Sequence, residues 1–387
     1  MGSYISRITS AATSEEEQQC LFVTPGMLVL DEIHFPTQDP IKDVIGGSGA
    51  YCHLGARLFF SPPQSRQLGW LIRTGDDFPS LVREEVQSWD TLLLETRVTG
   101  QLSTRGELIY QDTTFGPKTF RYTTKPLKVE PKYLVNTPLL SSPCFHFLST
   151  PNDQKDQVRE LLSFRDSFGL RECPAIIWEP SPPYCLPDNL SAFLEAIKFV
   201  DILSPNHIEL AAFFSIDLSN DEPLDRSIVE ELAQKCLASG IGPKKQGTIV
   251  VRAGHEGCCV YSRKQKEFVW LPPFYKDSPK VIDPTGAGNA FLGGFAIGLR
   301  ETADDVLASC YGSIASTFAL EQTGLPTLKP LRSTTADGAT MSSETWNGAN
   351  VRARLQEYTS RLGISLADSF NAPSRTHSPP ETRLSHL

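Results

Sequence analysis

The chain has 387 residues, 40% of them hydrophobic and 21% charged, proportions of a globular protein that exclude a wholly disordered chain or a fibre. Its formal net charge of -9 disfavours nucleic acid as an electrostatic partner. No run of about 18 uncharged apolar residues occurs, so no membrane span is expected. The length suffices for one large α/β domain or two ordinary ones.

Nine cysteines are present, and no two have the CxxC spacing of a metal or redox motif. They are expected to be reduced thiols that serve as small buried hydrophobic groups. The N-terminus also lacks the apolar core of a signal peptide. These features predict a soluble protein of the cytoplasm.

Residues 1–19 are polar and show no apolar period, which predicts a flexible leader. The leader begins MGSYIS, a short pattern that fits N-myristoylation at Gly2. Order is expected from Leu21, where LFVTPGMLVLDEI indicates two strands around a Pro-Gly turn. A Gly-rich loop and a helix through GAYCHLGARLFF complete a strand, turn and helix unit.

Strands and helices then alternate along the chain. QLGWLIRTGDDF predicts a buried strand, and residues 78–89 have helical spacing. Between residues 96 and 124 the short segments TRVTGQLS, ELIYQD and FRYTT predict a small antiparallel insertion. The later strands CFHFLS, PAIIWEP, VDILSPN and TIVVRAG are separated by helical segments. This alternation predicts a mostly parallel sheet covered on both faces, with ligand loops at the carboxyl ends of its strands.

The C-terminal part is more polar. Residues 331–345 are expected to form a loop before a last helix in VRARLQEYTSRL, and residues 366–387 a disordered tail. The chain ends in Ser385-His386-Leu387, which is similar to a peroxisomal address. The peroxisome is therefore the alternative to the cytoplasm.

The most informative segment is VIDPTGAGNAFLGGFAIGL, residues 281–299. An apolar strand end meets a turn of Gly286, Ala287 and Gly288, which opens an apolar helix whose first N–H groups have no partners inside the helix. Glycines allow the backbone to approach phosphate oxygens closely, and the helix dipole favours negative charge there. The segment therefore predicts a phosphate cradle.

This segment resembles the second signature of the PfkB family of carbohydrate and nucleoside kinases, DTxGAGDxFxxGF, at nearly every position. The resemblance implies transfer of the γ-phosphoryl group of ATP, with Mg²⁺, to a hydroxyl of a small substrate. It also implies a ribokinase-like α/β fold with a central mostly parallel sheet and a small antiparallel β lid, here residues 96–124. The family domain would occupy residues 20–365, as a monomer or homodimer.

Other family features follow in the expected order. GGSGAY resembles the first signature, so Gly46 and Gly47 would pack against the substrate, with Tyr51 in place of the usual Asn. Asp31 is similar to the family's N-terminal Asp, which accepts hydrogen bonds from substrate hydroxyls. Within the lid, Tyr110 is one of three aromatic residues that either face the substrate or simply pack.

The nucleotide side is indicated by two further motifs. SPNHIEL resembles the family's NxxE motif, in which Asn206 and Glu209 would organise Mg²⁺-bound water and phosphate. VVRAGHEG resembles the family's TxGxxG segment, so Gly254 and Gly257 would shape the nucleotide pocket, and Arg252 would reach a phosphate.

Asp283 and Thr285 match positions that bind a monovalent cation in many relatives, which makes K⁺ a further expected ligand.

The chain departs from the family pattern at Asn289, where the family has the Asp that takes the proton of the attacking hydroxyl. Three interpretations stay open. The chain is a slowed kinase, since general-base help is worth about 10²- to 10⁴-fold; or it is a pseudokinase that binds nucleotide or metabolite in a regulatory role; or it is an unrelated dinucleotide oxidoreductase, although GxGxxG is missing after the first strand. Asn289 together with WNG at residues 346–348 is similar to the fungal maintenance-of-killer-like branch.

Overall fold

The computed structural model describes residues 19–111, 118–218, 223–276, 278–334 and 340–366. The predicted leader, the modification at Gly2, the tail and the tripeptide Ser385-His386-Leu387 lie outside these residues, apart from Gln19 and Leu366 at the margins.

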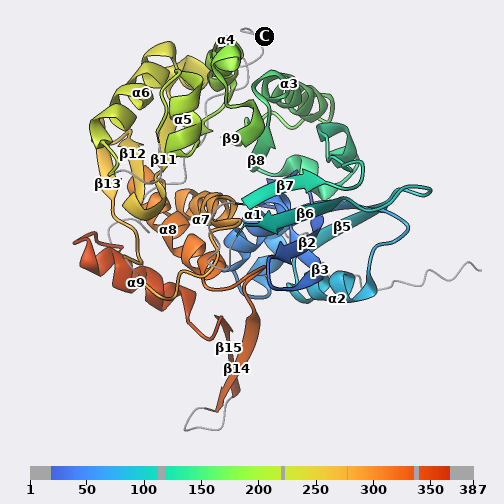
Figure 1. Cartoon of the computed structure of the whole chain (residues 1–387). Coiled ribbons are helices and arrows are strands. Elements are labelled where there is room, and N and C mark those ends of the chain that lie inside the picture. Colours follow the sequence, from blue (N-terminus) through green and yellow to red (C-terminus); the bar gives the residue numbers. More distant parts are fainter. Residues whose placement is uncertain (1–18, 112–117, 219–222, 277, 335–339, 367–387) are drawn as a thin grey trace, which may run out of the picture.

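The centre of the molecule is a nine-stranded sheet (Figure 1). In spatial order its strands are β13 (Glu267–Leu271), β12 (Cys258–Ser262), β11 (Thr248–Arg252), β10 (Ile202–Leu203), β9 (Ala175–Pro180), β8 (Cys144–Ser149), β1 (Phe22–Thr24), β4 (Leu68–Thr74) and β5 (Leu92–Arg97). The pairs from β5 to β11 are parallel, while β12 and β13 are antiparallel. Because β1 lies between β4 and β8, the strand order reverses direction beside it, which is where open α/β sheets bind ligands.

The strands are apolar on both faces because both faces are covered. In β9, Ile177 packs into one hydrophobic core, and its neighbours Ile176 and Trp178 pack into the other. The first core contains α1 (Ser48–Arg57), α2 (Ser80–Ser88), α7 (Ala287–Thr302), α8 (Asp305–Leu320) and α9 (Val351–Arg361). The second contains α3 (Pro151–Ser167), α4 (Leu190–Ala196), α5 (His207–Phe213) and α6 (Arg226–Ser239). This confirms the predicted mostly parallel sheet flanked by helices.

The cysteines behave as predicted. All nine are free thiols, and every one except Cys173 is buried.

A second, four-stranded sheet forms the lid. Its order is β3 (Gln38–Gly46), β2 (Val29–Phe35), β6 (Arg105–Tyr110) and β7 (Lys118–Tyr122). The prediction of a small separate β lid is confirmed, but its composition was predicted wrongly in two respects. TRVTGQLS does not supply a lid strand, because Thr96 and Arg97 end β5 at the edge of the main sheet. Instead β2 and β3 come from the N-terminal part, and β2 pairs with β6 in parallel.

The two strands around the Pro-Gly turn also separate, since β1 joins the main sheet and β2 joins the lid. Gly26 lies between the two strands, where the chain leaves the main sheet. A Cβ at this position would lie 2.5 Å from the backbone nitrogen of Gly49, so the chain passes tightly against the start of α1. The N-terminal segment thereby connects the lid to the sheet.

Residues 331–345, expected to form a loop, lie largely in a hairpin of β14 (Leu328–Thr334) and β15 (Thr340–Trp346). This hairpin projects from the body of the molecule (Figure 1). Polar composition suggested a loop, but backbone pairing needs no apolar face, and the threonines of this segment favour extended structure.

Helices α1 and α7 approach backbone to backbone, and glycines permit it. A Cβ on Gly293 of α7 would lie 1.9 Å from the carbonyl oxygen of Cys52 in α1, and one on Gly55 would lie 2.2 Å from the carbonyl oxygen of Ala290. The contact fixes the start of α7, and with it the predicted cradle, against the start of α1.

We therefore expect Gly293→Ala to destabilise the protein, although alanine is the better helix former by about 1 kcal/mol. Overlap with the α1 backbone should outweigh that gain and leave a net loss of about 1–3 kcal/mol in the free energy of unfolding. Chemical denaturation measures the change, with Ser360→Ala on the exposed side of α9 as control. Equal or greater stability of Gly293→Ala would contradict the close packing of these helices.

Candidate active site

The predicted cradle lies at the start of α7. Gly286 is the N-cap residue, with a left-handed φ of 75° and no side chain to cap the helix. A Cβ there would lie 2.3 Å from the ring of Tyr51, and one on Gly288 would lie 2.0 Å from Nη1 of Arg252. The turn is thus enclosed by an aromatic ring on one side and a guanidinium on the other, and Ala287 opens the helix between them.

Asn289 belongs to a largely buried polar cluster formed by side chains of β8, β9, β11 and α7. Its Nδ2 donates to Oε2 of Glu179 at 2.6 Å, and Nη2 of Arg252 lies 2.9 Å from the other carboxylate oxygen. Nε2 of His146 lies 3.4 Å from Oε2, and Arg252 also donates to the carbonyl oxygen of Ser204 at 3.0 Å. The cluster joins the predicted catalytic position to the predicted nucleotide residue Arg252.

Glu179 is the central member of this cluster, and sequence reasoning missed it. Burial alone would raise its pKa, but Arg252, His146 and Asn289 together outweigh burial and hold the pKa below its ordinary value. The side chain is therefore a carboxylate at neutral pH. The available signal was a single acid ending the apolar run PAIIWEP.

The NxxE motif forms a capping box at the start of α5. Asn206 accepts from the N–H of Glu209, and Glu209 accepts from the N–H of Asn206, both at 2.8 Å. The Glu209 carboxylate is buried, which raises its pKa to about 7 against the opposing effect of Arg252, whose Nη2 lies 3.6 Å away. One carboxylate oxygen already caps the helix, so a role toward Mg²⁺ through water fits better than direct ligation.

Gly254 and Gly257 form the tight turn between β11 and β12, with φ of 56° and 88°. A Cβ on Gly257 would lie 2.0 Å from the carbonyl oxygen of Leu271. The turn follows Arg252 closely in the chain, but no contact joins these glycines to the cluster around Glu179 among the described residues.

Asp31 of β2 is only 9% exposed, and its Oδ1 has no hydrogen-bond partner among the described residues. A Cβ on Gly46 would lie 1.9 Å from the other oxygen, so only glycine fits beside this carboxylate. Burial raises the pKa of Asp31 to about 7. Gly47, with φ of 89°, follows as the N-cap of α1.

Asp283 and Thr285 are brought together with two lid residues. The hydroxyl of Tyr110 lies 2.9 Å from both carboxylate oxygens of Asp283 and 3.0 Å from Oγ1 of Thr285. The Lys118 ammonium donates to Thr285 and lies 3.5 Å from Oδ1 of Asp283. A lysine therefore lies where the sequence predicted an external monovalent cation.

The structure thus brings the predicted residues together in two groups at the turn of residues 283–289. One surrounds Glu179 and comes from the main sheet. The other contains Asp283 and Tyr51 together with Asp31 of the lid strand β2. Burial raises the pKa of the Tyr51 hydroxyl, and the negative charges of Asp283 and Asp31 raise it further.

A cavity of about 930 Å³ lies at the carboxyl ends of β1, β8 and β9. Its lining includes Gly26 after β1, Ser48 at the start of α1 and the lid aromatics Phe120 and Tyr122. These two rings are about half exposed, so they face the cavity and the solvent, whereas Tyr110 is buried.

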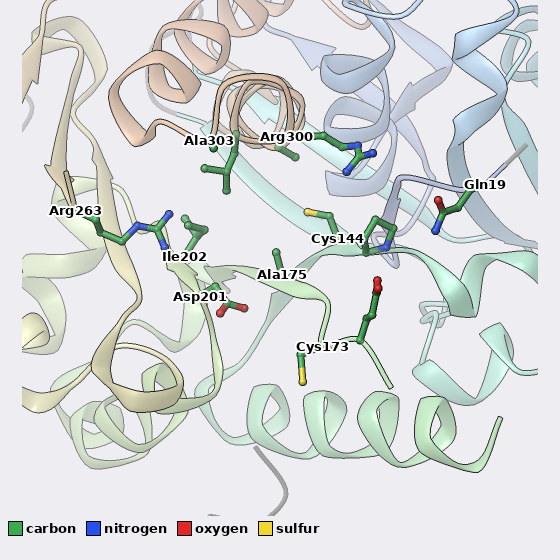
Figure 2. A pocket seen from close by; sticks show the side chains of 13 residues that line it. Gln19, Cys144, Cys173, Ala175, Asp201, Ile202, Arg263, Arg300 and Ala303 are labelled. Carbon is green, nitrogen blue, oxygen red and sulfur yellow. The ribbon is translucent and has the colours of Figure 1, made fainter. Parts of the chain in front are cut away.

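A smaller cavity of about 290 Å³ lies at the opposite edge of the sheet (Figure 2). Cys144, Ala175 and Ile202, the first residues of three parallel strands, line it together with Ala303 after the end of α7. It therefore lies far along α7 from the cradle and does not belong to the candidate site.

Neither a membrane-spanning helix nor a cluster of metal-ligating side chains is present in the part of the chain that the structure describes. No helix there has the length and apolar character needed to cross a bilayer, and no three His, Cys, Asp or Glu side chains there are grouped as metal ligands.

Comparisons with known proteins give matches in sequence and in fold. Residues 70–331 match the family described as pfkB family carbohydrate kinase. An uncharacterised protein of Schizosaccharomyces pombe is 32% identical over 87% of this chain and 92% of its own. Protein MAK32 of Saccharomyces cerevisiae is 30% identical over 90% of this chain and 94% of its own.

Among solved structures, ribokinase from Giardia lamblia covers 89% of this chain and 99% of its own, with a TM-score of 0.62 and 15% identity. A putative ribokinase II from E. coli in complex with ATP and Mg²⁺ covers 88% of this chain and 99% of its own, with a TM-score of 0.58 and 15% identity. Both likenesses show the fold.

Arg252→Met should destabilise the protein by about 3–5 kcal/mol, because it leaves a buried carboxylate without its cation. In the native chain the lowered pKa of Glu179 contributes stability above its unfolded pKa, and this is lost as pH falls through the folded value. Without Arg252, burial dominates and the pKa lies above the ordinary value. The cost of an ionised, buried Glu179 without its cation therefore grows as pH rises. The loss in the free energy of unfolding caused by Arg252→Met should be smaller near pH 5 than near pH 8.

Denaturation at both pH values measures this difference. The matched control is Arg97→Met, which breaks an exposed pair with Asp76 and should cost at most about 1 kcal/mol. A loss that is independent of pH would contradict the role of Arg252 as the cation for Glu179.

Proposed function

Because the chain belongs to the pfkB family of carbohydrate kinases, we propose that it binds ATP with Mg²⁺ and transfers the γ-phosphoryl group to a hydroxyl of a small acceptor. The acceptor is a sugar, nucleoside or related molecule under the lid.

The observation that carries this proposal is the unpartnered oxygen of Asp31. A buried carboxylate oxygen without a donor is costly, by several kcal/mol in order of magnitude. A ligand hydroxyl beside Gly46 and Gly47 would supply that donor. Ser48, the residue after Gly47, lines the cavity of about 930 Å³, and this cavity is the proposed entrance for such a ligand.

The phosphate end of the reaction fits the start of α7. Backbone N–H groups from Gly286 to Gly288 and the positive end of the helix dipole would stabilise the γ-phosphate. Arg252 borders Gly288 and would add positive charge, while Glu209 would position Mg²⁺ through water. Phosphoryl transfer depends mainly on such positioning and charge stabilisation.

Asn289 is expected to orient the acceptor rather than deprotonate it. Its amide nitrogen is committed to Glu179, so its oxygen is the atom left to accept from the hydroxyl. Without a base of suitable pKa, transfer should be slower by about 10²- to 10⁴-fold than with an aspartate.

The presence of Asn289 in place of a base favours a second candidate function. If Asn289 holds the hydroxyl without turnover, the chain would act as a pseudokinase that senses nucleotide or metabolite. The two candidates differ in phosphoryl transfer, not in binding.

A panel of sugars and nucleosides with ATP and Mg²⁺, with nucleotide binding measured in parallel, distinguishes them. Turnover above that of a Gly288→Ala control, in which the new methyl overlaps Arg252, would support the kinase. Nucleotide binding without turnover would support the pseudokinase. Absence of nucleotide binding would contradict both.

The pKa of Asp31 gives a pH prediction. Since the carboxyl has a pKa of about 7 and only the carboxylate accepts two hydroxyl hydrogens freely, kcat/KM for the acceptor should rise as pH increases through 7. Asp31→Asn should remove this rise and lower kcat/KM by about 10- to 100-fold. A steady-state pH profile tests both, and an unchanged profile in the variant would assign the titration to another group.

Restoring a base at residue 289 needs two changes. Asn289→Asp alone places a second carboxylate against Glu179, and the two would share a proton. In the double variant Asn289→Asp with Glu179→Gln, the amide at 179 can donate to the carboxylate at 289, so the hydrogen bond is kept with its direction reversed.

We expect the double variant to exceed the native kcat by about 10²-fold or more and to exceed Asn289→Asp alone. Glu179→Gln alone is the matched control, with thermal melting and ATP affinity measured for all three variants. If the double variant folds and binds ATP but gains no turnover, the missing base is not what limits the reaction.

A further inference from the structure

Lys118 extends from the lid strand β7 to Asp283 and Thr285, the residues just before the cradle. Its ammonium contacts three oxygens: it donates to Oγ1 of Thr285 and to the hydroxyl of Tyr110 at 3.4 Å, and it lies 3.5 Å from Oδ1 of Asp283. Three oxygens, one of them a carboxylate, match the three hydrogens of an ammonium group. Nothing in the motifs predicted this residue.

The carboxylate of Asp283 requires a cation. Asp283 is 1% exposed, and a buried carboxylate without positive charge nearby is strongly unfavourable. Its other contacts are hydrogen-bond donors without charge: the hydroxyl of Tyr110, and the N–H and hydroxyl of Thr285 at 2.9 and 2.6 Å. Among the described residues, Lys118 is the cation paired with it.

An external monovalent cation would need the same oxygens. Potassium is held by oxygen ligands, and here Asp283, Thr285 and Tyr110 already surround the Lys118 ammonium. The donor set therefore fits a bound ammonium group and leaves no vacancy for K⁺ beside it. We propose that Lys118 is a built-in substitute for a dissociable monovalent cation at Asp283 and Thr285, and that it tethers the lid to the phosphate cradle.

The tether follows from the position of each residue in the fold. Tyr110 ends β6 and Lys118 begins β7, and these two residues pair across the lid. Asp283 and Thr285 immediately precede the cradle at Gly286. The charge of Lys118 thus belongs to the lid, so a lid that opened would take the counter-cation away from Asp283.

Thermal melting of the ligand-free protein tests this assignment. Native protein should melt at the same temperature in KCl, NaCl and tetramethylammonium chloride of equal ionic strength. Lys118→Met should melt lower in tetramethylammonium chloride and should regain about 2–4 °C with KCl in a saturable manner, because K⁺ can then occupy the vacated oxygens. If Lys118→Met does not fold, Lys118→Gln is measured in its place with the same expected K⁺ response.

Two controls separate charge from general salt effects. Lys118→Arg keeps the positive charge and should show no K⁺ response. Lys125→Met alters an exposed lysine shortly after β7 and should behave as the native protein. The proposal would be overturned by a saturable K⁺ response in the native protein, or by the absence of one in both Lys118→Met and Lys118→Gln.

Only one consequence of this inference rests on the proposed function: if the native protein is a kinase, its turnover should not need K⁺. The melting experiments contain neither nucleotide nor acceptor. Loss of the kinase proposal in the substrate panel would therefore leave their outcome unchanged, and K⁺-dependent melting of the native protein would leave the kinase proposal standing.

Discussion

The buried carboxylate of Glu179 is the interaction on which the arrangement of the site depends. It lies one residue before the end of β9 and binds the side chains of Arg252 from β11 and Asn289 from α7, with His146 of β8 beside it. Three parallel strands and the cradle helix therefore converge on one negative charge. Because removing either the charge or its cation leaves the other buried and unpaired, these elements hold their relative positions as a unit.

Local sequence signals were sufficient for much of this structure. The apolar strands of the main sheet, the helices between them and the Gly-Ala-Gly turn were each predictable because a buried parallel strand or a glycine turn has a composition of its own. The lid was predicted less well. Whether Thr96 and Arg97 extend the main sheet or start the lid depends on pairing with β4, and that long-range register leaves no mark on a six-residue segment.

The residues of the site also divide into those that local sequence predicts and those that depend on long-range contacts. Gly286, Gly288 and Asn289 were found because a contiguous motif contains them. Glu179 and Lys118 were missed because their roles arise from side chains that meet across 110 and 167 residues of chain. A single acid after an apolar strand or a lysine in a lid strand is ordinary in isolation, and only the fold supplies the Asn289 amide or the Asp283 carboxylate beside it.

Charge balance explains which residue types stand in each of the two groups of the site. On the sheet side, Glu179 is balanced by Arg252, and an amide at residue 289 adds a hydrogen bond without adding a second negative charge. On the lid side, Asp283 is balanced by Lys118. Asp31 has no paired cation among the described residues, and burial raises its pKa to about 7. An aspartate at residue 289 would place a further acid against the buried Glu179 carboxylate, with only the existing cations to offset it. The neutral amide of Asn289 is therefore a better partner for the buried Glu179 carboxylate than an aspartate would be. The absence of a general base at residue 289 and the presence of a buried acid at residue 179 are thus two sides of one feature of this chain.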